Sequence, residues 1–442
     1  MVQITHTLTS VGKTYTFDIG GGGCDKRTTR TPTILEKDHI TIYCYGQDST
    51  SIYKDDTQLI LTLADGHGPK HSGNAISYRL HELIINCLLD IKDFLVSNLK
   101  LGKYDTIKST LDTIFNEVND TILYSDQLTS HYNSGGSTFV LVHKIIDEET
   151  GDLYTISSNV GDSSYMTVNS DEVTELSHDQ NCDNMVAVTQ YYNYCLDNGV
   201  EPSRIIFGRF NTPKGFKTPW IGDQPIEPYI CTKENGKYIL SQNTTAMKQI
   251  YELAPDYLKS NTFYNGGPQS IRCRPKNLEA LANGQFPMEN YGSTINGDLQ
   301  MVSSFGDKAS KIKHNIMCRP HTHISTNTNE HEFISSDGPM DCLTNNEIIK
   351  LFYYKKTTSM SMELFCEFLE KSIDIQAAIG GFSFMDCLPA WDDLSYWVVE
   401  TKVNESLQYR IRKLEEQNKL LLDYANQIKD TIKTTNIMLD TL

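Results

Sequence analysis

Five short acidic motifs in this 442-residue chain stand beside strand-like apolar runs, and their residue types could bind divalent cations. Each motif places an aspartate next to glycine or within a turn. They are Gln47-Asp48, Asp65-Gly66-His67-Gly68, Gly161-Asp162-Ser163, Ser336-Asp337-Gly338 followed by Asp341, and Asp392-Asp393. Magnesium and manganese prefer hard oxygen ligands. Carboxylates at strand ends can hold two such ions about 3.5–4 Å apart, and a water that bridges them becomes a nucleophile near neutral pH.

Each motif taken alone has a simpler explanation. Asp-Gly is a common turn dipeptide, so a single motif of this kind indicates only a turn. A glycine next to Asp65 would, however, let a backbone carbonyl approach a metal with no side chain in the way. The metal interpretation therefore depends on the order of the motifs and on the elements around them.

Strand-like and helical patterns flank the motifs. Alternating or short apolar runs predict strands at residues 14–19, 59–64, 138–142, 153–157 and 164–168. Helical spacing of apolar residues predicts helices over residues 75–99, 104–123 and 185–196. The run Gly20 to Gly23 predicts a flexible turn after the first strand. Residues 181–298 are interpreted as an insertion in a domain that spans residues 1–402.

The last 40 residues, 403–442, predict a coiled coil. Apolar residues and one asparagine recur every seven positions from Ile411, and a second series recurs from Leu407, as the a and d positions of a heptad repeat do. Asn418 at an a position favours a parallel dimer, whereas the run from Arg410 to Glu415 resembles a trimer-favouring motif. We therefore expect self-association through residues 404–442, as a dimer or a trimer. The alternative is a single amphipathic helix packed on its own domain.

The composition narrows the class of protein. A net charge of −17 repels the phosphates of DNA and RNA, so no nucleic-acid partner is expected. The 11 cysteines include no CxxC pair, which indicates free thiols in a reducing compartment rather than a zinc ribbon. The chain starts without a signal peptide and has no apolar run of the ~20 residues that cross a bilayer. A cytoplasmic protein without a membrane partner is the expectation.

The ordered set of motifs resembles the type 2C (PPM) family of metal-dependent serine/threonine protein phosphatases. In this chain the blocks read QDS, LADGHG, GGSTFVLV, YTISSNVGDSS, LSHDQN, SSFGD, EFISSDGPMDCLTNNEI and WDDLSYWVV, over about residues 40–400. In the family they read roughly (E/Q)D, DGHGG, GSTA, NVGDSR, LTxDH, SRAFGD, FLILASDGLWDVL and DN(I/L)(S/T). The chain is therefore similar to a divergent member of that family.

The resemblance implies a set of metal ligands. Asp65 would bridge two divalent cations, Mg²⁺ or Mn²⁺, and the Gly66 carbonyl would bind one of them. Asp337 and Asp392 would hold the second cation. Asp162 and Asp341 match the positions that bind a third, weaker cation in many members. The fold implied is α+β: a β-sandwich of two antiparallel sheets flanked by helices.

Two further roles follow from the resemblance. His67 matches the histidine that protonates the leaving alcohol, and Asp48 would act through water rather than as a direct ligand. The reaction implied is direct attack of a metal-activated hydroxide on phosphoserine or phosphothreonine of a phosphoprotein, with no covalent intermediate.

Several family residues are replaced in this chain. Tyr43 stands where the family has the arginine that binds substrate phosphate, and Ser164 and Ser303 replace two other arginines. Met340 replaces a tryptophan, and Asp393 replaces an asparagine. Charge-assisted hydrogen bonds contribute ~1.5–3 kcal/mol, so loss of the phosphate-binding arginine would weaken substrate binding roughly 10- to 150-fold.

Two hypotheses therefore remain open from the sequence. An active phosphatase is favoured because every metal-facing aspartate is retained, and Lys26, Arg27 or Arg30 could take the place of the arginine in space. A pseudophosphatase, which would bind partners or assemble without catalysis, is favoured by the missing arginines and the unusual insertion.

Overall fold

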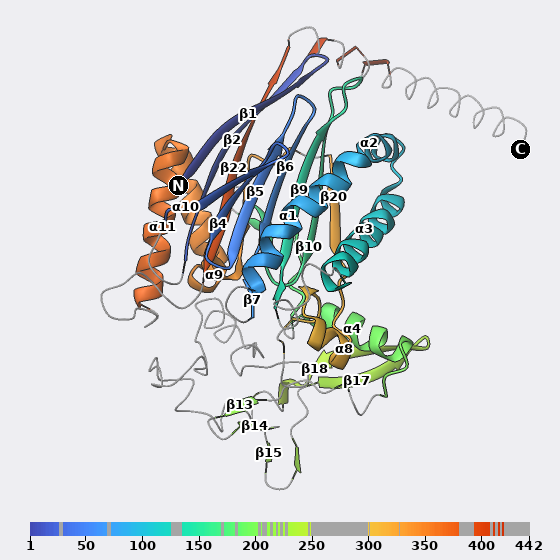
Figure 1. The fold of residues 1–442 in the computed structure, drawn as a ribbon. Helices are drawn as coiled ribbons and strands as arrows, with labels where there is room; N and C mark the ends of the chain where they lie inside the picture. The colour runs from blue at the N-terminus through green and yellow to red at the C-terminus, as the bar shows by residue number, and fades with distance from the viewer. Residues whose placement is uncertain are drawn as a thin grey trace, which may run out of the picture.

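Two antiparallel β-sheets form the centre of this computed structural model, and helices lie against their outer faces (Figure 1). The expected α+β sandwich is confirmed. The structure describes residues 1–25, 30–68, 72–124, 135–168, 172–181, 184–201, 205, 210–212, 215–217, 220–221, 224–225, 229–245, 248, 299, 301–326, 328–379, 393–406, 410–411, 414–415 and 418–419.

Most of the described strands belong to two main sheets and one small sheet, and the others form three separate hairpins. The six-stranded sheet has the order β1 (Val2–Ser10), β2 (Lys13–Cys24), β22 (Leu394–Glu405), β21 (His331–Ser335), β11 (Ser164–Val168) and β12 (Val173–Glu175). The seven-stranded sheet has the order β20 (His321–Ser325), β10 (Leu153–Val160), β9 (Phe139–Ile146), β6 (Gln58–Ala64), β5 (Asp48–Lys54), β4 (Ile40–Tyr45) and β3 (Thr33–Lys37). The small sheet joins β19 (Phe305–Gly306), β8 (Gly136–Ser137) and β7 (Gly66–His67).

Apolar side chains from both main sheets fill the space between them. Phe17 and Trp397 of one sheet are fully buried in the same cluster as Leu61 and Val142 of the other. Because side chains alternate between the two faces of a strand, the remaining apolar positions face the helices. The sandwich therefore holds the strand ends of both sheets in fixed relative positions.

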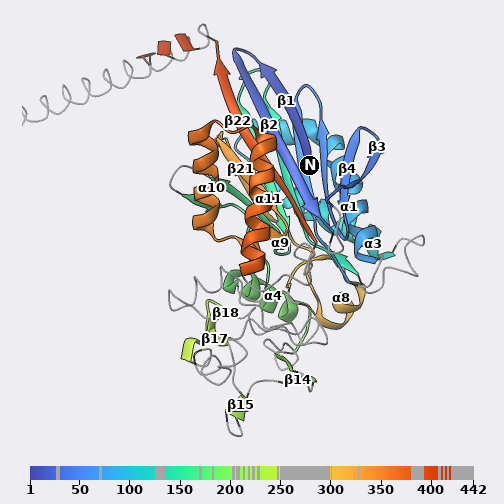
Figure 2. The same cartoon turned by 90° about the vertical axis from the view of Figure 1, so that its left-hand side faces the viewer.

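Helices cover both outer faces (Figure 2). Helices α1 (Ser72–Asp90), α2 (Lys92–Lys100) and α3 (Tyr104–Tyr124) pack on the seven-stranded sheet. Helices α9 (Asp337–Cys342), α10 (Asn345–Thr358) and α11 (Met362–Ile379) pack on the six-stranded sheet. The single helix predicted over residues 75–99 is two helices, since α1 ends one residue before Ile91 and α2 begins one residue after it.

The glycine run is not the turn that its composition predicts. Gly20 to Gly23 continue β2, and they pair with β22 as far as Cys24. A Cβ atom at Gly20 would lie 2.7 Å from Met362 Cγ, and one at Gly23 would lie 2.8 Å from the Tyr45 ring. Glycine is therefore required here by close packing of helix and strand rather than by backbone freedom, and this prediction was wrong.

Part of the expected insertion forms a small lobe beyond one end of the sheets (Figures 1 and 2). Helix α4 (Met185–Asp197) packs on the hairpin of β17 (Tyr229–Glu234) and β18 (Lys237–Gln242), and α8 (Lys308–His314) lies nearby. Two short hairpins, β13 (Phe210–Thr212) with β14 (Gly215–Lys217) and β15 (Trp220–Ile221) with β16 (Gln224–Pro225), also belong to this segment. Residues 249–298 lie outside the described residues.

The predicted coiled coil falls mostly outside the described residues. Strand β22 continues to Glu405, so it overlaps the first residues of the expected tail. Beyond it, Arg410, Ile411, Leu414 and Glu415 are described, and all four are helical and exposed. No helix among the described residues is both long and apolar enough to cross a bilayer.

Candidate active site

Three predicted aspartates lie at the same end of the seven-stranded sheet, where strands begin or finish. Ala64, the last residue of β6, pairs with Ser49, which follows Asp48 at the start of β5. Strand β9 lies between β6 and β10, and the start of β9 is beside the end of β10. Asp65 follows β6 and Asp162 follows β10. These two residues therefore lie at the same end of the sheet as Asp48, which begins β5.

The six-stranded sheet brings its aspartates to the same end. Ser335, the last residue of β21, pairs with Ser164 at the start of β11 and with Tyr396 near the start of β22. Asp337 follows β21 and begins α9. Asp162 lies in the turn by which the chain passes from β10 in one sheet to β11 in the other. The start of β11, which Asp162 precedes, is therefore adjacent to the end of β21, which Asp337 follows.

Hydrogen bonds join the two sheets at this end. The Ser395 hydroxyl donates to Asp48 Oδ2 at 3.0 Å, and the Gln47 backbone N–H donates to Asp393 Oδ2 at 2.6 Å. Gly46 has φ of +69°, and a Cβ atom there would lie 2.6 Å from the Asp393 carboxylate. Asp48 and Asp393 are buried, and both connect β5 to β22. Asp393 thus makes a structural contact at the position where the resembled family has asparagine.

The backbone at Asp65 is fixed by the segment at residues 137–138. Its carbonyl accepts hydrogen bonds from the Thr138 N–H at 2.9 Å and the Ser137 hydroxyl at 3.0 Å. The next residue, Gly66, donates to the Gln47 carbonyl at 3.2 Å, and a Cβ atom on Gly66 would lie 2.6 Å from that oxygen. The glycine in the Asp65 motif is therefore needed for packing, and the carboxylate is presented from a rigid backbone.

His67 is held by a buried carboxylate from a distant part of the chain. Its Nε2 lies 2.7 Å from Asp307 Oδ2, and the Ser304 hydroxyl donates to the same oxygen at 2.6 Å. Asp307 is only 4% exposed. A Cβ atom on Gly136 would lie 2.5 Å from His67 Nε2 and would also strike the Asp307 carboxylate. Glycine at this position therefore makes room for the pair.

The charges around His67 come from three other segments. Burial of the ring acts to lower the pKa of His67, but the charge and hydrogen bond of Asp307, with smaller contributions from Asp162 and Asp337, raise it above its usual value. Burial acts to raise the pKa of Asp307, and the His67 interaction, the Ser304 hydroxyl and the Lys311 charge lower it. The negative charges of Asp162 and Asp337 thus reach His67.

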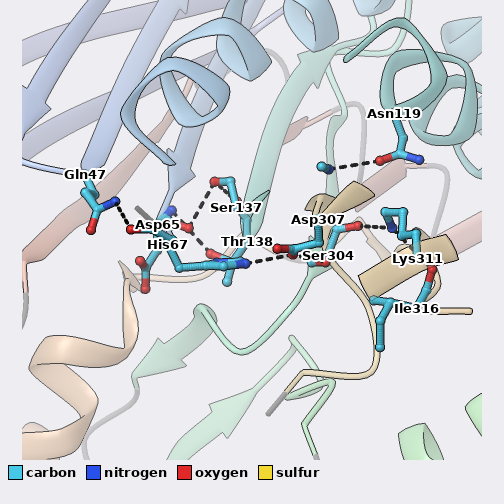
Figure 3. Close-up of polar contacts among 12 residues, drawn as sticks. Gln47, Asp65, His67, Asn119, Ser137, Thr138, Ser304, Asp307, Lys311 and Ile316 are labelled. Carbon is cyan, nitrogen blue, oxygen red and sulfur yellow. Dashed lines mark hydrogen bonds and ion pairs between the residues drawn. The ribbon is translucent and has the colours of Figure 1, made fainter. Parts of the chain in front are cut away.

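The turn that carries Asp307 is itself held in place (Figure 3). Lys311 Nζ donates to the backbone carbonyls of Ser304 at 2.6 Å and Met317 at 2.9 Å. Asn119 of α3 accepts a hydrogen bond from the Gly306 N–H at 3.1 Å. Backbone and side-chain contacts from two helices therefore fix the position of the carboxylate that binds His67.

Most of the predicted site residues are thus brought to one end of the sandwich: Asp48, Asp65, Gly66, His67, Asp162 and Asp337. Asp392 lies outside the described residues, as does the side chain of Asp341. Without those two carboxylates, no group of three or more histidine, cysteine, aspartate or glutamate side chains in the described part of the chain is arranged to hold a metal ion.

The residue at the place of the phosphate-binding arginine points away from this site. Tyr43 is 8% exposed and belongs to the apolar cluster between the sheets. Its ring packs edge-on against Trp397, with the two ring centroids 5.8 Å apart. A side chain in that position cannot bind a ligand at the strand ends. The replacement of arginine by tyrosine is therefore a change of packing and not only of charge.

Of the three basic residues that could take over, one is described. Arg30 forms ion pairs with Glu370 and Asp374 of α11. Those carboxylates neutralise its guanidinium and hold it against the helix. Lys26 and Arg27 lie outside the described residues.

Asp307 is the functional candidate that sequence reasoning missed. It is the last residue of the block SSFGD, in which Ser303 replaces an arginine of the resembled family. The retained Gly306-Asp307 pair was the available signal. Nothing in the sequence alone indicated that this aspartate, 240 positions away, would bind His67.

No protein-family model and no curated protein matches this sequence. Among solved structures, the chain is similar to serine-threonine phosphatase 2C from Toxoplasma gondii, with 12% identity over 91% of this chain and 99% of that chain and a TM-score of 0.49. It is also similar to the Mycobacterium tuberculosis serine/threonine phosphatase PstP/Ppp, with 14% identity over 87% and 98% of the two chains and a TM-score of 0.39. At identities of 12–14% and TM-scores below 0.5, these similarities say nothing about the site residues or the activity of this chain.

Proposed function

We propose that this protein is a metal-dependent phosphatase that hydrolyses phosphoserine and phosphothreonine in proteins. The observation that supports the proposal is that Asp65, Asp162 and Asp337 follow strands that finish at the same end of the sandwich, where the charges of Asp162 and Asp337 help to raise the pKa of His67. These carboxylates offer hard oxygen donors, which suit Mg²⁺ or Mn²⁺. They come from three different strand ends, a placement that local turn formation does not explain.

Residues of the chain divide the work as follows. Asp65, the Gly66 carbonyl, Asp337 and Asp392 would hold two divalent cations, and Asp162 with Asp341 would hold a weaker third. The two cations would supply a hydroxide nucleophile from bound water near neutral pH.

His67 would donate its proton to the leaving serine or threonine oxygen. Its Nε2 is engaged by Asp307, so Nδ1 is the atom left to face a substrate. Asp307 would act as a positioning residue that keeps the ring in one orientation. Asp48, tied to Ser395, would orient water rather than bind a cation directly.

Hydrolysis of a phosphothreonine peptide in the presence of Mn²⁺ or Mg²⁺ tests the proposal. We expect turnover that EDTA abolishes, and we expect Asp337→Asn to reduce kcat/KM by ~100-fold or more, because a metal-held charge contributes several kcal/mol to the transition state. Asp112→Asn is a matched control, since Asp112 lies on α3 and pairs with Arg319.

The second candidate is a pseudophosphatase, a folded domain that binds partners without turnover. Tyr43 in the core and Arg30 held by two carboxylates favour it, because neither can bind substrate phosphate. The same assay separates the two candidates. No turnover with either cation, and no difference between wild type and Asp337→Asn, would leave the binding function.

Self-association and location complete the proposal. Ile411 and Leu414 lie on a helix with 47% and 59% of their surfaces exposed, which suits an interface with a second copy of the chain. Cys24, Cys44 and Cys366 are buried free thiols. Free thiols suit a reducing compartment such as the cytoplasm.

A further inference from the structure

The block LSHDQN, residues 176–181, leads from β12 toward α4, and the proposed reaction uses none of its residues. Gln180 lies in this block, outside any strand or helix, and is only 6% exposed. A buried amide side chain in a connecting segment needs partners for its oxygen and for its NH₂ group. The partners of Gln180 therefore indicate what this block does in the molecule.

Gln180 holds the turn that carries Asp162 by two hydrogen bonds. Its backbone N–H donates to the Gly161 carbonyl at 2.8 Å, and its side-chain Oε1 accepts from the Gly161 N–H at 3.1 Å. Gly161 follows β10 and directly precedes Asp162. Its φ is +94°, and a Cβ atom there would lie 2.6 Å from Thr138 Cγ2. Gln180 thus binds both polar backbone groups of Gly161, and these bonds fix the direction in which the chain leaves the sheet.

The remaining polar groups of Gln180 bind the segments on either side of Asp307. Its side-chain Nε2 donates to the Arg319 carbonyl at 2.9 Å, and its backbone carbonyl accepts from the Val302 N–H at 2.8 Å. Val302 precedes Asp307 by five residues, and Arg319 lies beyond α8. Gln180 therefore joins the turn that carries Asp162 to the segment that carries Asp307, the carboxylate that holds His67.

The groups that surround Gln180 require an amide side chain at this position. The Gly161 N–H is bound by an acceptor and the Arg319 carbonyl by a donor, and one amide provides both together. A carboxylate only accepts, and an apolar side chain does neither. A buried backbone group that loses its partner costs free energy, so the turn would shift to find another.

We propose that Gln180 is a positioning residue of the proposed active site, which fixes the turn at residues 160–163 and so keeps the Asp162 carboxylate where a divalent cation binds it. The inference rests on the proposed function, in which Asp162 helps to hold the weaker third cation. Residues that orient the ligands of a metal site change its metal affinity by about 10- to 100-fold when they are replaced. Gln180 acts through the backbone of Gly161, and therefore through the position of Asp162.

Gln180→Met tests the contact with the turn, because methionine has about the length of glutamine but offers no N–H donor and only a weak acceptor. Hydrogen–deuterium exchange of the full metal-free chain, followed by mass spectrometry of peptides that cover residues 159–164, measures how often the turn opens. We expect exchange in these peptides to be about fivefold faster in the variant, because the Gly161 N–H loses its acceptor. An unchanged rate would mean that Gln180 does not hold the turn.

Binding of Mn²⁺ to the full chain measures the consequence for Asp162. Electron paramagnetic resonance of the free ion gives the number and the affinity of the bound ions without any turnover. We expect Gln180→Met to weaken the weaker class of Mn²⁺ site about tenfold and to leave the tighter class within about threefold of the wild type. Equal affinities in the wild type and the variant, or a wild type without a weaker class of site, would overturn the proposal.

Gln58→Met is the matched control. Gln58 is 1% exposed and its amide binds Asp55 and His143, but it begins β6 and so lies at the opposite end of that strand from Asp65. We expect this variant to be less stable in urea, with unchanged Mn²⁺ binding and unchanged exchange in residues 159–164. Equal weakening of the weaker Mn²⁺ class by both variants would show a general loss of stability and contradict the proposal.

Failure of the proposed function is a separate outcome of the same set of proteins. A wild type that hydrolyses no phosphothreonine peptide with Mn²⁺ refutes the proposed activity. The exchange and Mn²⁺-binding measurements need no turnover, so they decide the role of Gln180 in either case.

Discussion

The carboxylate of Asp307 is buried with the help of three separate chain segments. His67 and Ser304 bond to one of its oxygens, and Gly136 leaves the space that the pair occupies. Such an arrangement fixes which His67 nitrogen is engaged and which one is left for another group. Partners that orient a functional histidine in this way affect activity by about 10- to 100-fold in metal sites.

We expect Asp307→Asn to lower kcat of phosphopeptide hydrolysis by about 10- to 100-fold while the Mn²⁺ concentration needed for half-maximal activity stays the same. The amide has the size of the carboxylate but lacks the charge that holds the imidazole. Measurement of kcat, KM and the Mn²⁺ dependence separates this outcome from general damage. A fall in Mn²⁺ affinity with unchanged kcat would show that Asp307 supports the metal ligands instead.

Sequence reasoning succeeded at this scale where a residue's role depends on its neighbours in the chain. Asp65 and Gly66 follow a strand of apolar residues, and that local pattern predicts their place at a strand end. It failed for Tyr43 and Asp307, whose roles depend on which sheet face a side chain occupies and on a partner 240 positions away. Those facts are set by register and tertiary packing, which the local pattern does not contain.

The hairpin of β5 and β6 depends on one aspartate in its turn. Asp55 Oδ1 accepts from the backbone N–H groups of Thr57 at 2.8 Å and Gln58 at 2.9 Å. Burial acts to raise the pKa of Asp55, but these hydrogen bonds, with those from the two side chains, lower it to about 2. A carboxylate with a depressed pKa stabilises the folded state above its unfolded pKa, and that contribution is lost as the pH falls through the folded value.

We therefore expect the free energy of unfolding to fall between about pH 4 and pH 2, and Asp55→Asn to remove about 1 kcal/mol of stability at pH 7, after allowance for the partial exposure of Asp55. Below about pH 2 the carboxyl group of Asp55 is protonated in the wild type. The free energies of unfolding of the variant and the wild type should then no longer differ because of this charge. Urea denaturation at a series of pH values measures both quantities. An equal difference at pH 7 and pH 2 would mean that the contribution is not electrostatic.

Strands from the two sheets are also joined by a buried ion pair. Lys144 of β9 and Glu332 of β21 lie 2.8 Å apart with side-chain exposures of 2% and 0%, and the Tyr165 hydroxyl donates to the same glutamate oxygen at 2.9 Å. Removing one partner of such a pair leaves an uncompensated charge in the core. The pair therefore contributes more to the specific alignment of the two sheets than to the net free energy of folding.

Lys144→Met should lower the free energy of unfolding by about 3–5 kcal/mol, and the double variant Lys144→Met/Glu332→Gln should recover most of that loss. Guanidinium denaturation of the wild type, both single variants and the double variant gives the coupling energy. Additive losses in the double variant would contradict the role of charge pairing.

Element boundaries were predictable from the sequence wherever the period of apolar residues was clear. Residues 164–168 form β11 and residues 104–124 form α3, nearly as their patterns predict. The glycine run of β2 was mispredicted because its glycines serve close packing against α11 and β22, and such packing leaves no local trace in the sequence.

At the scale of the whole molecule, the tail is the element proposed to join copies of the chain. Ile411 and Leu414 are exposed on a helical segment that follows β22, and the heptad pattern continues to the last residue. Truncation after Ser406 keeps β22 complete and removes only the tail.

We expect the full chain to be a dimer or trimer and the truncated chain to be a monomer by multi-angle light scattering, with unchanged phosphatase activity per chain, because the residues proposed for the site all lie before Ser406. The double variant Ile411→Ser/Leu414→Ser should have the same effect as truncation. An oligomer that survives the truncation would place the interface elsewhere on the molecule.

The position of β22 in the six-stranded sheet has a consequence for folding of the chain during its synthesis. This strand lies between β2 and β21, and its pairing with β2 joins residues 13–24 to residues 394–405 over twelve consecutive pairs. Contacts so distant in sequence form slowly, because a long loop must close before they stabilise anything. During synthesis on a ribosome, β2 would have one unpaired edge until almost the entire chain has emerged. Asp392 would be synthesised just before β22, the strand that completes the sheet. A chain released early would lack both the central strand and a proposed metal ligand, so the proposed hydrolysis would require the finished chain.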